Sequence, residues 1–419
     1  MSLVDARTQL ERWIAPARYA RLMQVRELAA RLGLPLYLVG GFVRDLLLGQ
    51  PPDDFDFVVE GDAPRLAQAA AREWGGEVQA HTPFGTATWT APDGVSVDFA
   101  SARTETYAYP AALPHVQIPA TLQADLARRD FTINALALRL DGAHFGELID
   151  PYHGQADLTA GRVRVLHPRS FQDDPARMFR AARYEQRLGF AITADTLALI
   201  PGAWEALAAL TGDRARREFE LIFREPNAVK MLARLNTLDV LTHVHPALAW
   251  DEAASAQAAL IPTLPAADWR GPVPLEPDAL CLALLLRRAS PEAAAEALTR
   301  LNPNRSTEQA VLEALALHKN WSRPSEAVAA LDKLSELGVI AAYVLRPEWQ
   351  ADLHAYLARW RFVRAETTGD DLIARGLTPG PRFKTLLWEL RAARLDGAIT
   401  DHAGEQAWLT HQLTRPEAE

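Results

Sequence analysis

The strongest constraint on the fold is a change in residue pattern at Pro151. Before this position, short runs rich in β-branched and aromatic residues are separated by Gly, Pro and Asp, which is typical of strands joined by turns. After it, Ala and Leu recur at helical spacing to the end of the chain, and prolines mark the expected helix junctions. The sequence therefore predicts an α/β head domain followed by an all-α remainder.

Within the head, the spacing of apolar residues predicts one helix over residues 6 to 33, ending at Gly33. A Gly40-Gly41 pair and a short helix to Leu48 follow the first strand. Strands are predicted at residues 36–39, 55–59, 85–90, 95–100, 132–138 and 147–149. The N-terminal 150 residues are thus expected to form a mixed α/β domain.

Acidic residues gather on two of these strands. Asp54 and Asp56 are alternate residues, so their side chains are expected to share one face of a strand. Two carboxylates this close repel each other unless a cation lies between them, and hard oxygen ligands of this kind suit Mg²⁺. Asp98 lies on a separate predicted strand. It completes a set of three carboxylates that suits a site with two metal ions.

Gly40 and Gly41 lie where a predicted strand gives way to a helix. Because glycine has no Cβ, the backbone N–H groups there can approach a triphosphate at the positive end of the helix. Neither motif is specific alone, since Gly-Gly often marks only a tight turn and glycosyltransferases also use an Asp-x-Asp pair. The order of strand, Gly-Gly, helix, short turn and Asp-x-Asp strand favours metal-dependent nucleotidyl transfer.

This order resembles the head signature of the class II CCA-adding enzyme and bacterial poly(A) polymerase family. The resemblance is carried by LVGGFVRDLLLG at 38–49, DFD at 54–56, RRDFTINA at 128–135, LIDP at 148–151 and FQDDPARMFRAAR at 171–183. A weaker likeness lies in the tail, at residues 369–373 and 376–381. One position departs from the pattern, because the family usually has Glu-Asp where this chain has Asp173-Asp174.

The resemblance implies catalytic residues Asp54, Asp56 and Asp98, of which Asp54 and Asp56 bind the metal. The nucleotide-binding residues that we expect are Gly40, Gly41, Arg44, Arg129, Asp130, Asn134, Asp174, Arg177, Arg180 and Arg183. The family resemblance also implies four parts: a head at 1–150, a helical neck with base recognition at 151–240, a helical body at 241–340 and a helical tail contacting tRNA at 341–419.

Chemistry favours Asp174 and Arg177 as the base-reading pair. Cytosine and adenine present an amino donor beside a ring-nitrogen acceptor, whereas uracil and guanine present the reverse. A carboxylate beside an arginine therefore accepts C and A and leaves both groups unpaired with U or G. Asp174 and Arg177 are three apart on a predicted helix, so they project to neighbouring positions. The alternative is a plain surface ion pair at a helix N-terminus.

Arg177, Arg180, Arg183 and Arg187 form a stripe on the same predicted helix. Such a stripe is usually a solvated face, and beside a nucleotide site it also suits triphosphate and the tRNA acceptor end. Residues 102–119 are poor in strand signal and contain prolines, which predicts a mobile loop. The resemblance implies that this loop helps to switch the site from C to A.

Composition restricts the setting. The net charge of −9 argues against a general nucleic-acid coat but leaves room for a local basic groove. The single cysteine, Cys281, excludes a disulfide framework and fits a reducing cytoplasm. The N-terminus lacks the pattern of a signal peptide, and the longest apolar run, 279–286, is far shorter than the ~20 residues that span a membrane.

The sequence therefore predicts a template-independent enzyme that adds C and/or A, from CTP and ATP, to the 3′ end of tRNA with Mg²⁺ and releases pyrophosphate. A poly(A) polymerase, or a CC-only or A-only enzyme of the same family, is the nearest alternative. A non-catalytic RNA-binding protein is the alternative from a different class. The oligomeric state stays open.

Overall fold

The computed structural model describes residues 6–52, 55–269 and 275–414. The chain separates into two compact units, an N-terminal unit at 1–214 and a C-terminal unit at 215–419. The expected strands of the head lie in the N-terminal unit, and the regular elements among the described residues of the C-terminal unit are all helices. The predicted α/β head followed by helices is confirmed.

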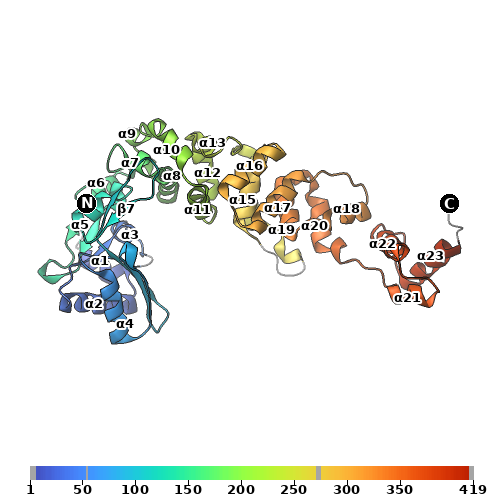
Figure 1. Ribbon diagram of the computed structural model, residues 1–419, viewed down its shortest axis with the longest axis horizontal. Helices are drawn as coiled ribbons and strands as arrows, with labels where there is room; N and C mark the ends of the chain where they lie inside the picture. Colours follow the sequence, from blue (N-terminus) through green and yellow to red (C-terminus); the bar gives the residue numbers. More distant parts are fainter. Residues whose placement is uncertain (1–5, 53–54, 270–274, 415–419) are drawn as a thin grey trace. The chain divides into compact units, whose positions relative to one another are not determined.

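A seven-stranded mixed sheet forms the centre of the N-terminal unit (Figure 1). In spatial order its strands are β3 (Glu77–His81), β4 (Thr86–Thr90), β5 (Ser96–Ser101), β2 (Asp56–Val59), β1 (Leu36–Val39), β8 (Ala137–Arg139) and β9 (Leu148–Ile149). Neighbouring strands are antiparallel except β2 and β5, which run parallel. This one parallel pair lies in the middle of the sheet and carries the acidic residues.

Among the residues described, ten α-helices lie wholly within the N-terminal unit and surround the sheet or follow it. They are α1 (Ala6–Trp13), α2 (Pro16–Arg31), α3 (Gly41–Leu47), α4 (Ala63–Trp74), α5 (Leu122–Ala127), α6 (Gly154–Thr159), α7 (Ser170–Asp173), α8 (Ala176–Leu188), α9 (Ala194–Leu197) and α10 (Trp204–Ala209). Two short ribbons, β6 (Thr104–Thr106) with β7 (His115–Gln117) and β10 (Arg162–Val163) with β11 (Ala191–Ile192), complete the unit.

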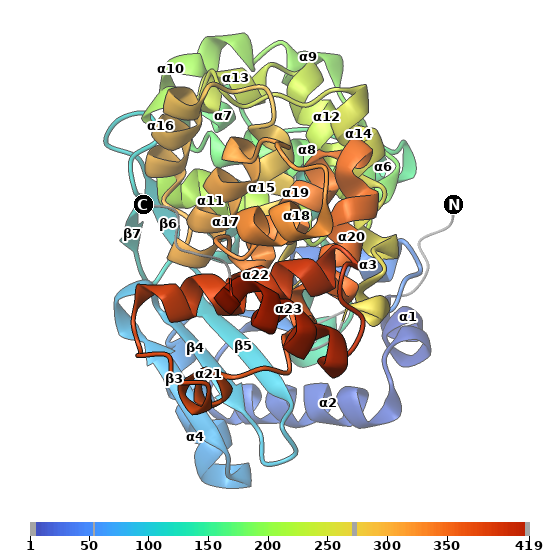
Figure 2. The ribbon, with the colours of Figure 1, turned by 90° about the vertical axis from the view of Figure 1, so that its right-hand side faces the viewer.

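One face of the sheet is covered by α4, which packs on β4 and β5 and is itself flanked by α2 (Figure 2). Alternate residues of the strands point to this side and are buried, among them Trp89, Val97 and Phe99. Phe57 and Phe99 stack with ring centroids 5.5 Å apart. The residues between these positions, which include Asp56 and Asp98, therefore point to the opposite face.

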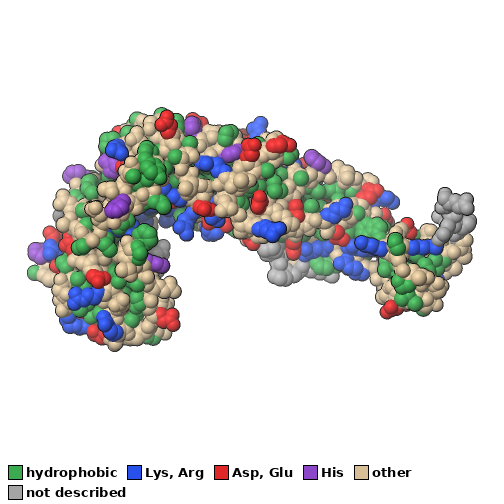
Figure 3. Space-filling model, viewed as in Figure 1, with side chains coloured by type: hydrophobic (Ala, Val, Ile, Leu, Met, Phe, Trp, Pro, Cys, Tyr) green, Lys and Arg blue, Asp and Glu red, His purple; other side chains and the backbone are tan. Residues whose placement is uncertain are grey.

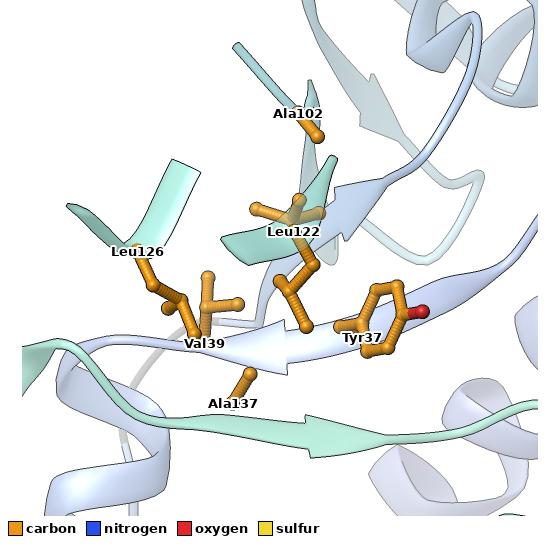
Figure 4. Packing of buried hydrophobic residues seen from close by; sticks show 7 residues of the cluster. Tyr37, Val39, Ala102, Leu122, Leu126 and Ala137 are labelled. Carbon is orange, nitrogen blue, oxygen red and sulfur yellow. The ribbon is translucent and has the colours of Figure 1, made fainter. Parts of the chain in front are cut away.

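The opposite face has a smaller core, built where α5 crosses β1 and β8 (Figure 4). Leu122 and Leu126 of α5 meet Tyr37 and Val39 of β1 and Ala137 of β8. Helix α5 begins after Thr121, whose hydroxyl accepts a hydrogen bond from the Ala124 N–H. This helix brings the arginines that follow its end, Arg128 and Arg129, to the acidic strands.

Several predicted elements differ from the structure. The helix expected over residues 6–33 is two helices, because Pro16 has no N–H to donate and begins α2. In place of a strand over 132–138, Thr132–Asn134 form a 3₁₀ turn and only Ala137–Arg139 join the sheet. The prediction omits β3, an edge strand whose mostly exposed side chains show no apolar alternation.

The segment 102–119, predicted as a loop without strands, contains the β6–β7 ribbon. Each of these strands has three residues, which is too short for a readable alternation of apolar and polar positions. Glu105 of β6 anchors the ribbon by accepting hydrogen bonds from Arg103, Tyr107 and Arg128. The prediction of a strand-free loop is therefore wrong.

The C-terminal unit packs helix on helix, and α11 crosses into it from the N-terminal unit. Its helices are α11 (Gly212–Phe223), α12 (Ala228–Thr237), α13 (Val240–Val244), α14 (Glu252–Ala258), α15 (Pro277–Leu285), α16 (Pro291–Leu301), α17 (Arg305–Ala316), α18 (Pro324–Leu331), α19 (Glu336–Leu345), α20 (Gln350–Ala358), α21 (Gly369–Ala374), α22 (Pro381–Leu395) and α23 (His402–Thr414). Among the residues described, none of the helices has the length and apolar character needed to cross a membrane.

Candidate active site

Two of the three predicted catalytic aspartates lie side by side on the open face of the sheet. Asp56 of β2 is the register partner of Asp98 of β5 in the parallel pair. Both residues are exposed. Val97 and Phe99, the neighbours of Asp98 along β5, are buried on the opposite face of the sheet. Thr88 of β4 is the register partner of Asp98 on its other side, and its hydroxyl donates to Asp98 Oδ1 over 2.5 Å.

The third predicted aspartate, Asp54, lies outside the described residues, as does Asp53. Among the residues that are described, no group of three or more His, Cys, Asp or Glu side chains is arranged to hold a metal ion. The described part of the acidic set consists of Asp56 and Asp98. Two exposed carboxylates in register are hard oxygen donors of the kind that bind divalent cations together with substrate phosphates.

Gly40 lies between β1 and α3 with φ of +66°, a conformation that residues with a Cβ rarely adopt. A Cβ at this position would lie 2.7 Å from Arg129 Nη1. The backbone angle therefore favours glycine at 40, and a side chain there would also displace the Arg129 guanidinium. Gly41 is under no such demand, because a Cβ there would meet Arg44 Nη2 at an ordinary 3.5 Å.

The arginines after α5 are held by a buried carboxylate. Asp125 accepts hydrogen bonds from Arg128, at 2.7 Å from Nη2, and from Arg129, at 3.0 Å from Nη2. Burial alone would raise the pKa of Asp125, but the guanidinium groups of Arg129 and Arg128 outweigh it and hold the pKa below its usual value. Asp125 is thus ionised and fixes the direction in which both arginines point.

A second buried carboxylate organises the residues between α3 and α8. Asp130 Oδ1 accepts from the Asn134 amide at 3.0 Å, and its Oδ2 lies 2.6 Å from Arg180 Nη2. Burial would raise the pKa of Asp130, but Arg180 and Asn134 lower it below the usual value. Asn134 Oδ1 accepts in turn from Arg44 Nη1 at 2.9 Å, and Arg44 also pairs with Asp45. These residues form one connected network.

The predicted base-reading pair lies at the junction of α7 and α8. Asp174 has an extended backbone between the two helices, so it is not part of a helix, and the prediction that both residues share one is wrong. Pro175 accounts for this, because the residue before a proline is disfavoured in the helical region. Arg177, in the first turn of α8, has its Nε 3.9 Å from Asp174 Oδ2.

Arg177 is 4% exposed, which excludes a solvated surface ion pair. Its Nη1 donates to Ser170 Oγ at 2.6 Å and its Nη2 to the Arg128 carbonyl at 2.7 Å. Asp174 has a closer partner than Arg177, namely Arg214, whose Nη2 donates to Asp174 Oδ1 at 2.6 Å. Arg214 Nη1 also donates to the Ala111 carbonyl in the segment between β6 and β7, at 3.2 Å.

These side chains line one cavity of about 640 Å³ in the N-terminal unit. Its lining residues are Gly40, Gly41, Phe42, Arg44, Asp45, Asp56, Asp98, Arg103, Glu105, Tyr107, Arg128, Arg129, Asp130, Asn134, Asp174, Arg177, Arg180, Tyr184 and Arg187. All the predicted nucleotide-binding residues line it except Arg183, which is buried with its guanidinium 5.9 Å from the Tyr184 ring. The arginine stripe of α8 is thus divided, with Arg177, Arg180 and Arg187 facing the cavity.

Among the described residues, charged side chains of both signs line this cavity, seven arginines and six carboxylates. Figure 3 shows acidic and basic side chains interspersed on the face that it displays, as expected for a chain with a net charge of −9. In the cavity, Asp125 and Asp130 hold guanidinium groups in place. The cavity therefore offers fixed guanidinium groups to the phosphates of a ligand, although its seven arginines and six carboxylates leave the lining close to neutral.

The sequence reasoning missed four lining or supporting groups. Arg103, Glu105 and Tyr107 belong to or flank β6, and burial together with the Glu105 carboxylate raises the pKa of Tyr107 to about 12. Arg214 is the fourth group, and its guanidinium donates to Asp174. None of the four carries a local signal beyond its charge or ring, because their roles depend on contacts between distant segments.

A mixed sheet that presents paired carboxylates beside a Gly-Gly turn and an arginine-rich cavity is the architecture of a nucleotidyltransferase head. The Poly A polymerase head domain family matches residues 36–164, and the probable RNA and SrmB-binding site of polymerase A matches residues 189–251. The chain belongs to the tRNA nucleotidyltransferase family, an enzyme family, as the following relatives establish.

The chain is 34% identical over 392 residues to the A-adding tRNA nucleotidyltransferase of Halalkalibacterium halodurans, covering 90% of this chain and 88% of that protein. It is 35% identical over 395 residues to the CC-adding tRNA nucleotidyltransferase of Deinococcus radiodurans, covering 93% of each. It is 37% identical to the A-adding tRNA nucleotidyltransferase of Geobacter sulfurreducens, over 90% of this chain but only 45% of that longer protein.

Solved structures agree in fold. The Thermotoga maritima CCA-adding enzyme complexed with tRNA is 29% identical, with a TM-score of 0.78 over 98% of this chain and 99% of that one. CCA-adding enzymes complexed with ATP and with CTP, also 29% identical, give TM-scores of 0.82 and 0.81 at the same coverage. The predicted family and fold class are confirmed.

Proposed function

We propose that this chain adds C and/or A, from CTP and ATP, to the 3′ end of tRNA without a nucleic-acid template, and so builds or completes the CCA end. The observation that carries the proposal is that a single cavity contains the Asp56 and Asp98 carboxylates, the arginine network and the Asp174–Arg177 pair. Relatives named as A-adding and CC-adding enzymes support the choice of tRNA as the acceptor.

We assign magnesium as the metal. Asp56 and Asp98 fit it because both carboxylates are exposed and in register on one face of the sheet, and Asp54 is the further ligand expected from the sequence. The chemistry that bound Mg²⁺ supplies is charge neutralisation at the phosphates and a lower pKa for the attacking hydroxyl. The wider family of nucleotidyltransferases is generally metal-dependent.

The chain's own residues bind and orient the nucleotide. Arg129, fixed by Asp125, lies in the space that a Cβ at Gly40 would fill, which places its guanidinium at the glycine turn where the triphosphate is expected to bind. Asp130, Asn134 and Arg180 form the next part of the network, in which ribose hydroxyls and phosphate oxygens find both donors and acceptors. In the reaction, a bond forms between the tRNA 3′-oxygen and the α-phosphorus, the bond to pyrophosphate breaks, and the hydroxyl proton passes to solvent.

Choice of base rests on Asp174 and Arg177 in this proposal. The carboxylate accepts from the amino group of cytosine or adenine, and the guanidinium donates to the adjacent ring nitrogen. Because Arg177 is buried and held by Ser170 and the Arg128 carbonyl, its position is set before the nucleotide binds. A base of the wrong pattern would leave both groups unpaired, at a cost of about 1–3 kcal/mol each.

Addition of A is included because the segment between Ala102 and Pro119 is long enough to form the β6–β7 ribbon, and its residues Glu105 and Tyr107 line the nucleotide cavity. We expect this segment to take part in the switch from C to A. A poly(A) polymerase, or an enzyme restricted to CC or to A, remains a distinct outcome of the experiment below.

The experiment incubates three tRNAs, ending at the discriminator base, after the first C and after CC, with CTP, ATP or both, in the presence of Mg²⁺. Complete CCA synthesis needs both nucleotides on the first tRNA and only ATP on the third. Incorporation of many A residues would identify a poly(A) polymerase, and products that stop at CC, or form only from CC ends, would identify a specialist.

Asp56→Ala tests the site itself. We expect a loss of at least about a thousandfold in pyrophosphate release, because one ligand of the metal pair is removed, with an unchanged melting temperature. The matched control is Asp93→Ala, an exposed aspartate of the same unit that pairs with Arg21 away from the cavity. Full activity of a folded Asp56→Ala protein would remove the proposed mechanism.

A further inference from the structure

A second cavity, of about 370 Å³, adjoins the acidic strands of the N-terminal unit. Its lining residues are Val39, Asp56, Phe57, Val58, Thr86, Ala87, Thr88, Asp98, Phe99, Ala100, Arg128 and Arg129. It shares Asp56, Asp98, Arg128 and Arg129 with the nucleotide cavity, so the two spaces meet at the carboxylates. A transfer reaction needs a binding place for each of its two substrates beside the reacting centre. The two cavities provide one such place on either side of the carboxylates.

The two cavities differ in the side chains that line them. The larger one contains arginines on α3, after α5 and on α8, as well as the Gly40 turn, and so suits a triphosphate. The smaller one has the two shared arginines, an apolar part made by Val39, Val58 and Ala100, and two threonine hydroxyls. A polynucleotide end carries a diol at its terminus and one negative charge per phosphodiester, groups that the threonine hydroxyls and the two arginines are able to bind.

The threonines belong to β4, which lies beside β5 in the sheet (Figure 2). Thr86, Thr88 and Thr90 are alternate residues on the open face, and Ala87 and Trp89 between them are buried under α4. Thr88 donates to Asp98 Oδ1. Thr86 Oγ1 has no hydrogen-bond partner among the described residues, so its hydroxyl is available to a ligand in the cavity.

We propose that this second cavity receives the 3′-terminal ribose of the RNA acceptor, with Thr86 bonding its 2′-hydroxyl and Thr88 positioning Asp98 beside its 3′-hydroxyl. The inference rests on the proposed function, because it places the acceptor of that same reaction. It adds a site for the acceptor and two positioning residues on β4. A 2′-hydroxyl contact also distinguishes an RNA end from a DNA end.

Strand β4 contains both the positions to be tested and a matched control position, Thr90. Thr86→Val and Thr88→Val remove a hydroxyl while keeping a β-branched side chain of nearly the same shape, so the strand is expected to fold. Thr90→Val makes the same change on the same face of β4, where Thr90 bonds Ser96 and does not line the cavity. The three variants are compared in steady-state addition of one A to a tRNA ending in CC, with equal melting temperatures required.

Losing one hydroxyl contact is expected to raise KM for the tRNA about fivefold in Thr86→Val, with KM for ATP unchanged within about twofold. Wild type is expected to prefer an acceptor ending in ribose to one ending in 2′-deoxyribose by a similar factor, and Thr86→Val is expected to lose that preference. Thr88→Val is expected to lower kcat, because Asp98 loses the hydroxyl that positions it, and Thr88→Ser, which keeps the hydroxyl, is expected to restore kcat. Thr90→Val is expected to match wild type throughout.

The inference is overturned if Thr86→Val keeps the ribose preference of wild type, if KM for ATP rises as much as KM for tRNA, or if Thr90→Val behaves like Thr86→Val. The same holds if Thr88→Val has the kcat of wild type, or if Thr88→Ser does not restore kcat. Failure of the proposed function has a different signature, because wild type itself would then add no nucleotide to any tRNA.

Discussion

The contact between Arg214 and Asp174 predicts that nucleotide choice depends on a residue that no nucleotide touches. Arg214 Nη2 lies 2.6 Å from Asp174 Oδ1, and the two side chains are 25% and 18% exposed. Arg214→Ala removes this donor and leaves Asp174 with the Ala176 N–H at 3.2 Å and Arg177 Nε at 3.9 Å. The carboxylate is then free to turn away from the base that it is proposed to read.

The size of the effect follows from the burial of the pair. A hydrogen bond between charged groups that are mostly shielded from water contributes about 1.5–3 kcal/mol. Two weaker contacts continue to hold Asp174 in the variant, so we expect about 1–2 kcal/mol of lost discrimination. Since each 1.4 kcal/mol is about a factor of ten, this corresponds to a change of roughly 5- to 30-fold.

The assay compares ATP with ITP as substrates for a tRNA ending in CC. Hypoxanthine carries a carbonyl and a ring N–H where adenine carries an amino group and a ring nitrogen, so ITP tests the contact with Asp174 directly. The ratio of kcat/KM for ATP to that for ITP should fall by the factor above in Arg214→Ala. Arg214→Lys, which keeps the charge, should recover part of it.

The matched control is Arg217→Ala, which removes an exposed arginine from the same helix α11. This variant should keep the wild-type ratio, because any general effect of lost positive charge on tRNA binding cancels between the two nucleotides. An unchanged ATP/ITP ratio in a well-folded Arg214→Ala protein would refute the reasoning, as would an equal drop in Arg217→Ala.

Two further predictions concern stability. Gly40→Ala should lower the free energy of unfolding by about 1–2 kcal/mol, because φ is +66° and the new Cβ would lie 2.7 Å from Arg129 Nη1. Denaturant titration measures this loss against the control Gly41→Ala, where a Cβ has ordinary space. Equal free energies of unfolding in the two variants would contradict the prediction. Asp125 and Asp130 have lowered pKa values, so the stability they contribute is complete above the ordinary Asp pKa of about 3.9 and is lost as pH falls through their folded values. The melting temperature should therefore fall steeply below about pH 4, and Asp130→Asn should flatten that dependence; an identical slope in the variant would show that Asp130 is not responsible.

The sequence by itself determined the class of fold and much of the candidate site. Strand and helix periods are local properties, so the order of β1, the glycine turn, α3 and β2 can be read along the chain. The same holds for the glycine at 40, since a turn between strand and helix often needs a positive φ. Family resemblance added the residues after α5 and in α8, of which Arg183 does not line the cavity.

Only the tertiary structure decided how these segments meet. The pairing of β2 with β5 puts Asp56 opposite Asp98, and no local pattern specifies which strands become neighbours. Arg214 reaches Asp174 across 40 residues, and Thr88 reaches Asp98 because β4 and β5 pair in one register. Such contacts depend on which packing of the whole unit has the lowest free energy, and a sequence window shorter than the unit does not contain that information.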